Sequence, residues 1–117
     1  MKEEAKTELG TIRIHEDVIS SIAFIAAQEI EGVKKVGFKI FLPNKILQIL
    51  GIRYPGIRVS IEKNDEVRLN ISLVIKFGYN IPEVSSRVQE NVRLNLEKMS
   101  SVSIRDITIS VIGVERS

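Results

Sequence analysis

The stretch EVRLNISLVIKF, residues 66–77, decides the fold, because it carries the strongest strand signal in the chain. Apolar and polar residues alternate along it, with Val74 as the one exception. This period of two is typical of a strand that buries one face. A shorter alternation over residues 57–61 comes just before it, across a polar turn. The two strands are therefore expected to form a hairpin.

A helix is predicted directly after this strand. Gly78 breaks the strand, Asn80 is a suitable N-cap, and Pro82 falls in the first turn of the helix. Apolar residues then recur with a helical period as far as Met99, with charged residues on the opposite side. The period of two returns over residues 104–114, which predicts a last strand.

The N-terminal part repeats this pattern on a smaller scale. Residues 10–14 alternate as in a short strand. Residues 16–31 then carry a wide apolar stripe of helical period, which includes Val18 and Ile25. This part of the chain therefore predicts one strand and one amphipathic helix.

The middle of the chain is the least regular part. Residues 33–40 have the composition of a further strand, and they lead into a segment, residues 41–56, that is interrupted by proline and glycine. The apolar run at residues 46–52 is expected to form a short turn of helix inside this segment.

The predicted order of elements is β-α-β-β-β-α-β, in a single domain of residues 1–117 with a flexible N-terminal tail at residues 1–8. Strands that are apolar on one face only must be covered on that face and left wet on the other. We therefore predict an α+β fold. It should be a two-layer sandwich in which two helices pack on one face of a mostly antiparallel sheet.

The composition indicates a small folded protein, and its lack of cysteine fits a reducing compartment. Hydrophobic residues make up 44% of the chain and charged residues 27%, unlike the composition of unfolded chains. No cysteine is present, which excludes disulfides and thiolate chemistry. The charged N-terminus lacks the apolar core of a signal peptide, and no apolar run approaches the roughly 20 residues that span a bilayer. We therefore expect a cytoplasmic protein, peripheral to the membrane only through a partner or by surface contact.

The sequence contains no motif for catalysis, metal binding or nucleotide binding, and we expect no cofactor. The one histidine, His15, has no second ligand at a metal-binding spacing and is interpreted as a capping or surface residue. Serine pairs lie outside the known nucleophile motifs, and isolated glycines form no phosphate loop. We therefore predict that the protein is not an enzyme.

Several apolar residues stand where the periodicity predicts solvent, which suggests a protein interface. Phe24 and Leu94 fall on the outer faces of the two helices, Ile112 falls on the outer side of the last strand, and Ile46 and Leu50 belong to the apolar run. Single exposed apolar residues are also common on protein surfaces, and the apolar run could instead close one end of the core. Both interpretations stay open.

The wet face of the sheet offers an alternative surface. Arg13, Arg58, Arg68 and Lys76 are expected there and could form a basic stripe for nucleic acid. No aromatic residue stands among them for base stacking, which speaks against nucleic acid as the partner. A small-molecule or lipid pocket beneath the apolar run is a third hypothesis.

The sequence resembles the alkaline shock protein family. In the N-terminal half the resemblance rests on GTIRI at residues 10–14 and EIEGV at residues 29–33. In the C-terminal half it rests on FGYNIP at residues 77–82, VQENV at residues 88–92 and IGV at residues 112–114. It extends over nearly the whole chain.

The resemblance implies a cytoplasmic protein, mainly of Gram-positive bacteria, that acts in the envelope stress response and in envelope homeostasis. Relatives are thought to work by protein contacts, some of them held near the membrane by a separate anchor protein, and some are linked to fatty-acid or lipid supply. No catalytic motif comes with the family. The middle segment departs from the glycine-rich pattern of relatives, so the resemblance does not identify the partner. We therefore expect a protein-binding scaffold or adaptor that forms a homo-oligomer.

Overall fold

The computed structural model describes residues 3–7, 10–14, 16–37, 44–49 and 54–116. In chain order the elements are β1 (Glu3–Thr7), β2 (Gly10–Ile14), α1 (Glu16–Gln28), β3 (Val33–Val36), α2 (Asn44–Ile49), β4 (Ile57–Ile61), β5 (Glu66–Lys76), α3 (Ile81–Met99) and β6 (Ser103–Glu115).

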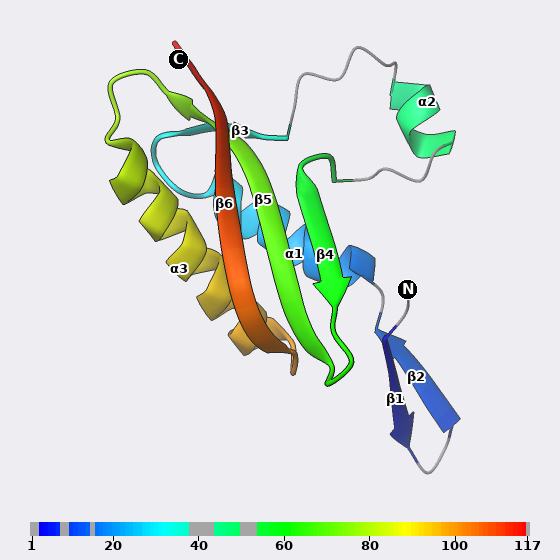
Figure 1. Cartoon of the computed structure of the whole chain (residues 1–117). Coiled ribbons are helices and arrows are strands. Elements are labelled where there is room, and N and C mark those ends of the chain that lie inside the picture. The colour runs from blue at the N-terminus through cyan, green and yellow to red at the C-terminus, as the bar shows by residue number, and fades with distance from the viewer. Residues whose placement is uncertain (1–2, 8–9, 15, 38–43, 50–53, 117) are drawn as a thin grey trace.

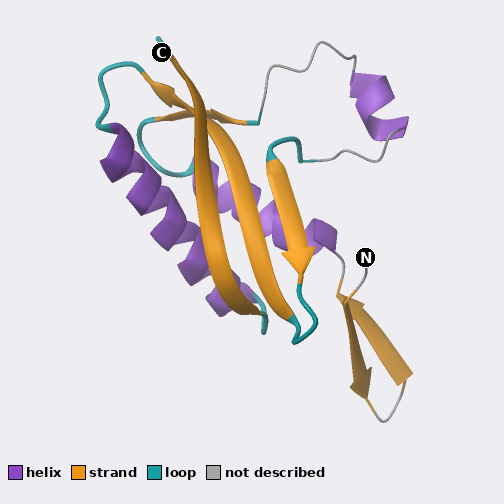
Figure 2. Ribbon diagram, in the orientation of Figure 1, coloured by secondary structure: helices purple, strands orange, loops and turns teal. Residues whose placement is uncertain are grey.

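The long strand β5 is the centre of the main sheet. β6 pairs with it in parallel along one edge, over the whole length of β5. β4 and β3 pair with it antiparallel along the other edge, β4 with its first half and β3 with its second half. α1 and α3 cover one face of this sheet and leave the other open, as Figures 1 and 2 show. The predicted α+β sandwich, with a mostly antiparallel sheet, is confirmed.

The core lies between the sheet and these two helices. The alternation predicted for the central strand is confirmed, because every second residue of β5 points into the core and is at most 2% exposed. These residues are Val67, Leu69, Ile71, Leu73 and Ile75, and α3 meets them with Val84, Val88, Val92 and Leu96.

The start of α3 follows the sequence prediction. The side-chain oxygen of Asn80 accepts a hydrogen bond from the backbone N–H of Glu83, at 2.9 Å, and Pro82 lies in the first turn. The Glu83 carboxylate does not return to the cap but pairs with Arg87, one turn further along. This start aligns α3 so that its apolar stripe faces the sheet.

The N-terminal region differs from the prediction. Residues 3–7, expected in a flexible tail, form β1, which pairs antiparallel with β2. This hairpin is a sheet of its own, so the main sheet has four strands and does not include residues 10–14. β1 has no apolar alternation. Its strand conformation comes from backbone pairing with β2, which side-chain periodicity does not report.

α1 buries Ile19, Ala23 and Ala26 of the predicted stripe, but the buried face is rotated relative to that stripe. Ser20 is buried and Phe24 is half-buried, whereas Val18 and Ile25 are 48% and 59% exposed. Apolar side chains surround most of this helix, so the period alone does not determine which part of the stripe meets the sheet.

β3 and β4 behave as two parts of one interrupted edge strand. Val36, at the end of β3, pairs with Leu73, and Ile57, at the start of β4, pairs with Ile71. The ladder between these pairs has room for a single residue opposite Ser72.

Two glycines share that single place. The N–H of Gly37 donates to the carbonyl of Ser72 at 2.8 Å, and the N–H of Ser72 donates to the carbonyl of Gly56 at 2.8 Å. Both glycines have positive φ, 112° and 90°, and a Cβ on Gly56 would lie 2.7 Å from the nitrogen of Gly37. Residues 38–55, hereafter the insert, therefore leave and re-enter the sheet at one point. α2, within the insert, stands apart from the sheet and the long helices (Figure 1).

Candidate interaction surfaces

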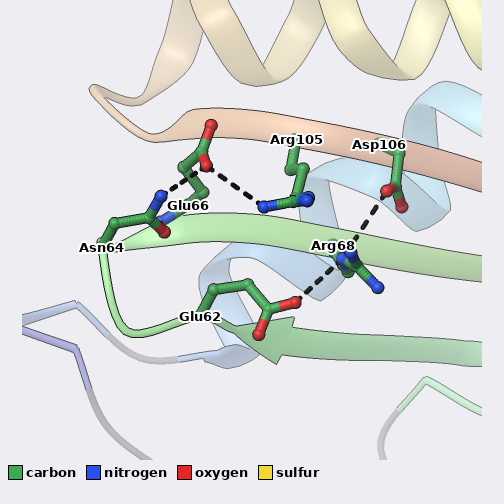
Figure 3. A network of polar contacts seen from close by, with 6 residues as sticks. All are labelled: Glu62, Asn64, Glu66, Arg68, Arg105 and Asp106. Atoms are coloured by element: carbon green, nitrogen blue, oxygen red, sulfur yellow. Dashed lines mark hydrogen bonds and ion pairs between the residues drawn. The ribbon is translucent and has the colours of Figure 1, made fainter.

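The open face of the sheet carries a network of ion pairs close to the β4–β5 turn (Figure 3). Nε of Arg68 lies 2.8 Å from Oε1 of Glu62 and 3.5 Å from Oδ2 of Asp106. Nη1 of Arg105 lies 3.8 Å from Oε1 of Glu66. Three carboxylates thus face two guanidinium groups, so the network carries a net charge of −1 (2 − 3).

The predicted basic stripe is therefore offset by acidic neighbours. Arg58 and Arg68 line a shallow hollow of about 280 Å³ whose lining also includes Glu62 and Asp106. Lys76 lies at the far end of β5 from Arg68, and Arg13 belongs to the separate β1–β2 hairpin. A face of mixed charge lacks the continuous positive potential that phosphate backbones require.

The apolar residues predicted to form a protein interface lie on four different elements. Leu94 on α3, Ile46 on α2 and Ile112 on β6 are 56%, 39% and 46% exposed. Phe24 on α1 packs against the core, and its ring lies against that of Tyr54, with centroids 5.6 Å apart.

Other predicted positions lie outside the described residues. These positions are Leu50 and His15. For Arg13, the structure describes the backbone but not the side chain. Among the residues that are described, no group of three His, Cys, Asp or Glu side chains could hold a metal ion.

Exposed apolar residues lie on both helices that cover the sheet, and those of α1 were not predicted to be exposed. Nδ2 of Asn91 on α3 donates to the carbonyl of Ala26 on α1 at 2.7 Å and lies 3.5 Å from Oε2 of Glu29. Ile25 stands one turn before Glu29, and Leu94 stands one turn after Asn91. Because α1 and α3 run in opposite directions (Figure 1), Ile25 and Leu94 both lie from this contact toward the end of the pair where α1 begins and α3 ends.

Val18 also lies on α1, two turns before Ile25. We call Val18, Ile25 and Leu94, which are 48%, 59% and 56% exposed, the helix-layer patch. The spacing of seven residues between Val18 and Ile25 is a sequence signal for a second apolar stripe on α1. It was hidden because these residues also fit the broad stripe assigned to the core.

The outer edge of β6 is partly covered by α3. Within the described ranges β6 pairs with β5 alone, and Nε2 of Gln89 donates to the outward carbonyl of Ile107. A hollow of about 310 Å³ follows this edge, lined among others by Ser86, Glu90 and Arg93. A strand added to this edge would donate a backbone N–H to the Ile107 carbonyl. The Gln89 amide already donates to that carbonyl, which disfavours strand addition there.

Tyr79 ties the β5–α3 turn to the turn after α1. Its hydroxyl donates to Oε1 of Glu31 at 3.3 Å, and its ring lies so close to Gly32 that a Cβ there would be 2.8 Å from the ring. The negative charge of Glu31 raises the pKa of Tyr79 above its ordinary value, with smaller contributions from desolvation and the hydrogen bond.

A family model with the description "cell envelope-related function" matches residues 4–116. The chain belongs to the alkaline shock protein 23 family. This confirms the resemblance seen in the sequence. Within the described part of this family member, no helix is long and apolar enough to cross a bilayer.

Relatives of this alkaline shock protein 23 family member occur in Bacillus and Streptococcus. YqhY of Bacillus subtilis (strain 168) is 34% identical over 110 residues, which cover 93% of this chain and 80% of YqhY. Spy1614 of Streptococcus pyogenes serotype M6 is 25% identical over 116 residues, which cover 98% of this chain and 96% of Spy1614. Both are described as uncharacterized proteins, so they add no activity or partner.

Solved structures of the MamM CTD share the fold. One variant aligns with a TM-score of 0.53 at 11% identity, covering 86% of this chain and 99% of the MamM CTD chain. The copper form of another variant aligns with a TM-score of 0.52 at 11% identity, covering 85% and 98%. At this identity the likeness concerns the fold alone.

Proposed function

We propose that this alkaline shock protein 23 family member is a protein-binding scaffold or adaptor in the envelope-related function of its family. It acts by contact and not by catalysis. The observation that supports this proposal is the helix-layer patch, because its three apolar side chains, on the two helices that cover the sheet, are about half exposed.

The surroundings of the patch suit a protein partner. α1 and α3 are packed on the sheet and joined by the Asn91 contact, so the patch is presented on a rigid support. Exposed charged residues of α3, Glu90 and Lys98 among them, lie beside Leu94. An apolar centre with a charged rim is the usual composition of a protein interface.

The use of polar side chains supports a role without catalysis. Arg68 is held between two carboxylates, Asn80 caps α3, and Arg87 pairs with Glu83. Each of these side chains stabilises the fold, through an ion pair or through a helix cap.

We propose further that the protein works in the cytoplasm and forms a homo-oligomer, with the helix-layer patch as one of its contact surfaces. A membrane-anchor protein as partner, and a link to fatty-acid or lipid supply, belong to this proposal through the family resemblance.

Capture of partners by chemical cross-linking in cells tests the proposal. Ile25→Asp and Leu94→Asp place a charge in the patch and should remove the proteins that the unchanged chain captures. Met99→Asp is the matched control, because Met99 is on the same helix and is 64% exposed. Capture of the same proteins by all three variants would contradict the proposal. Light scattering that shows a monomer at high concentration would remove the homo-oligomer.

A further inference from the structure

We propose that the C-terminal end of β6 pairs with the same segment of a second copy of this chain, antiparallel and about a two-fold axis at Gly113. The contact joins the two four-stranded sheets edge to edge. It deepens the homo-oligomer proposed above and rests on that part of the proposed function. It does not involve the helix-layer patch.

β6 is an edge strand whose two halves differ. Within the described ranges it pairs with β5 alone. In its first half, the Gln89 amide already donates to the outward carbonyl of Ile107. Over residues 111–115, no described side chain bonds to the backbone, and in Figure 1 no described element lies in front of this part of β6. Unpaired backbone groups on a strand edge are a template for another strand.

The backbone of this open half determines which residues can pair with another strand. The N–H of Phe77 donates to the carbonyl of Glu115 at 2.7 Å, so the backbone groups of Glu115 face β5. Successive residues of a strand direct these groups to opposite edges, so those of Val114 and Ile112 face outward. Ile112 is the extra residue of a bulge, because Val111 pairs with Leu73 and Gly113 with Val74. The bulge breaks the alternation, so a regular outer ladder begins at Ile112.

A centre at Gly113 makes this short segment complementary to itself. Ile112 of each copy then lies opposite Val114 of the other, and each such pair exchanges two hydrogen bonds. The side chains of Ile112 and Val114 are 46% and 44% exposed in the single chain, so apolar surface meets apolar surface. Glu115 and Arg116 lie opposite uncharged residues. A centre at Val114 would instead place Arg116 opposite Ile112.

The position of the axis also leaves room for two whole molecules. Gly113 lies close to the end of β6, so copies paired in this way overlap over only a few residues. The closed first half of each β6, with its Gln89 contact, stays outside the overlap. A second copy therefore fits this edge without any change in α3.

A cysteine in place of Gly113 tests the register directly. The chain has no cysteine of its own, and a Cβ on Gly113 would meet Cγ2 of Val74 at 4.0 Å, an ordinary contact. In the proposed pair the two Cα atoms of residue 113 are about 4.5 Å apart, which a disulfide can span. Gly113→Cys should therefore form a disulfide-linked dimer when dilute protein is treated with oxidised glutathione. Thr108→Cys is the matched control on the same strand, because its two copies would be about 33 Å apart.

Sedimentation velocity measures the association without a cross-link. The unchanged chain should form dimers as its concentration rises. Val114→Pro removes an N–H that faces away from β5, so the ladder between β5 and β6 keeps its bonds. It should weaken the dimer about tenfold or more, because each copy loses one hydrogen bond and presents a proline ring. Val114→Ile keeps the N–H and should associate nearly as the unchanged chain does, and circular dichroism checks that each variant is folded.

Three results would overturn the proposal: no cross-link in Gly113→Cys, equal cross-linking in Thr108→Cys, or unchanged association of Val114→Pro. Association that persists in Val114→Pro but is lost in Leu94→Asp would refute the β6 contact alone. The reverse result would refute the helix-layer patch as an oligomer contact and support the β6 contact. A chain that is monomeric at every concentration would refute both contacts, whereas capture of partner proteins still tests the scaffold.

Discussion

Deletion of residues 38–56 should give a folded protein in which β3 and β4 become one continuous strand. The deletion removes the insert together with Gly56 and joins Gly37 to Ile57. Gly37 then fills the single place opposite Ser72, and Ile57 keeps its partner on β5. No register shift is needed, so the apolar face of β4 stays on the core.

The stability of this variant follows from two opposing terms. Closing a flexible loop of this length costs about 2.5 kcal/mol of chain entropy, which the deletion recovers. The deletion also removes Tyr54 from its contact with Phe24, and such aromatic pairs contribute about 0.5–1.5 kcal/mol beyond burial of area. We therefore expect a free energy of unfolding within about 2 kcal/mol of the unchanged chain.

Urea unfolding followed by circular dichroism measures this free energy. The control is the deletion of residues 38–55, which keeps Gly56 and leaves two residues where the ladder has room for one. That variant must form a bulge and should be the less stable of the two. Loss of a cooperative transition in the 38–56 deletion, or a loss of more than about 3 kcal/mol, would show that the insert belongs to the core and refute the register argument.

Three further substitutions test the core, the cap and the tyrosine contact. Leu96→Ala should cost about 2–5 kcal/mol in urea unfolding because Leu96 is fully buried, whereas Leu94→Ala on the same helix should change stability by about 0.5 kcal/mol or less. Asn80→Ala should cost about 1 kcal/mol by loss of the cap, and Asn80→Asp should restore most of it; equal stability of all three forms would contradict this. Ultraviolet titration, with the second tyrosine replaced by phenylalanine, should give Tyr79 a pKa above the ordinary value, and Glu31→Gln should lower it. Because folding raises this pKa, the contribution of Tyr79 to stability is present below the ordinary tyrosine pKa and disappears as the pH rises through the pKa of the folded state. An unchanged pKa of Tyr79 in Glu31→Gln would exclude the carboxylate as the cause.

The sequence predicted well the elements whose apolar residues recur with one simple period and therefore mark a single buried face. Every second residue of β5 from Val67 to Ile75 points into the core, with Val74 as the one further buried residue of this stretch. The start of α3 was predictable because a cap uses residues close in sequence, here Asn80 and Glu83. Local chemistry and simple periods are sufficient for these elements.

The elements that were mispredicted depend on information that no single segment contains. β1 is a strand because β2 pairs with it, and the face that α1 buries depends on where the sheet lies. The helix-layer patch was missed for the second reason, since Val18 and Ile25 were assigned to the core. The interruption of the edge strand could not be predicted either, because Gly37 and Gly56 are distant in sequence and come together only in the folded sheet, opposite Ser72.

The position of the insert explains why an apolar, basic segment is compatible with this small fold. An insertion inside β5 or α3 would displace residues of the core, and each displaced large side chain would cost about 2–5 kcal/mol. At the Gly37–Gly56 junction the chain leaves an edge strand and returns to the same backbone position, so every core contact of β3 and β4 is kept. The constraints on the insert are then set by what it contacts outside the fold, whereas those on β5 and α3 are set by packing. Ile46 and Ile49 on α2 are 39% and 82% exposed, so the core does not require these two side chains.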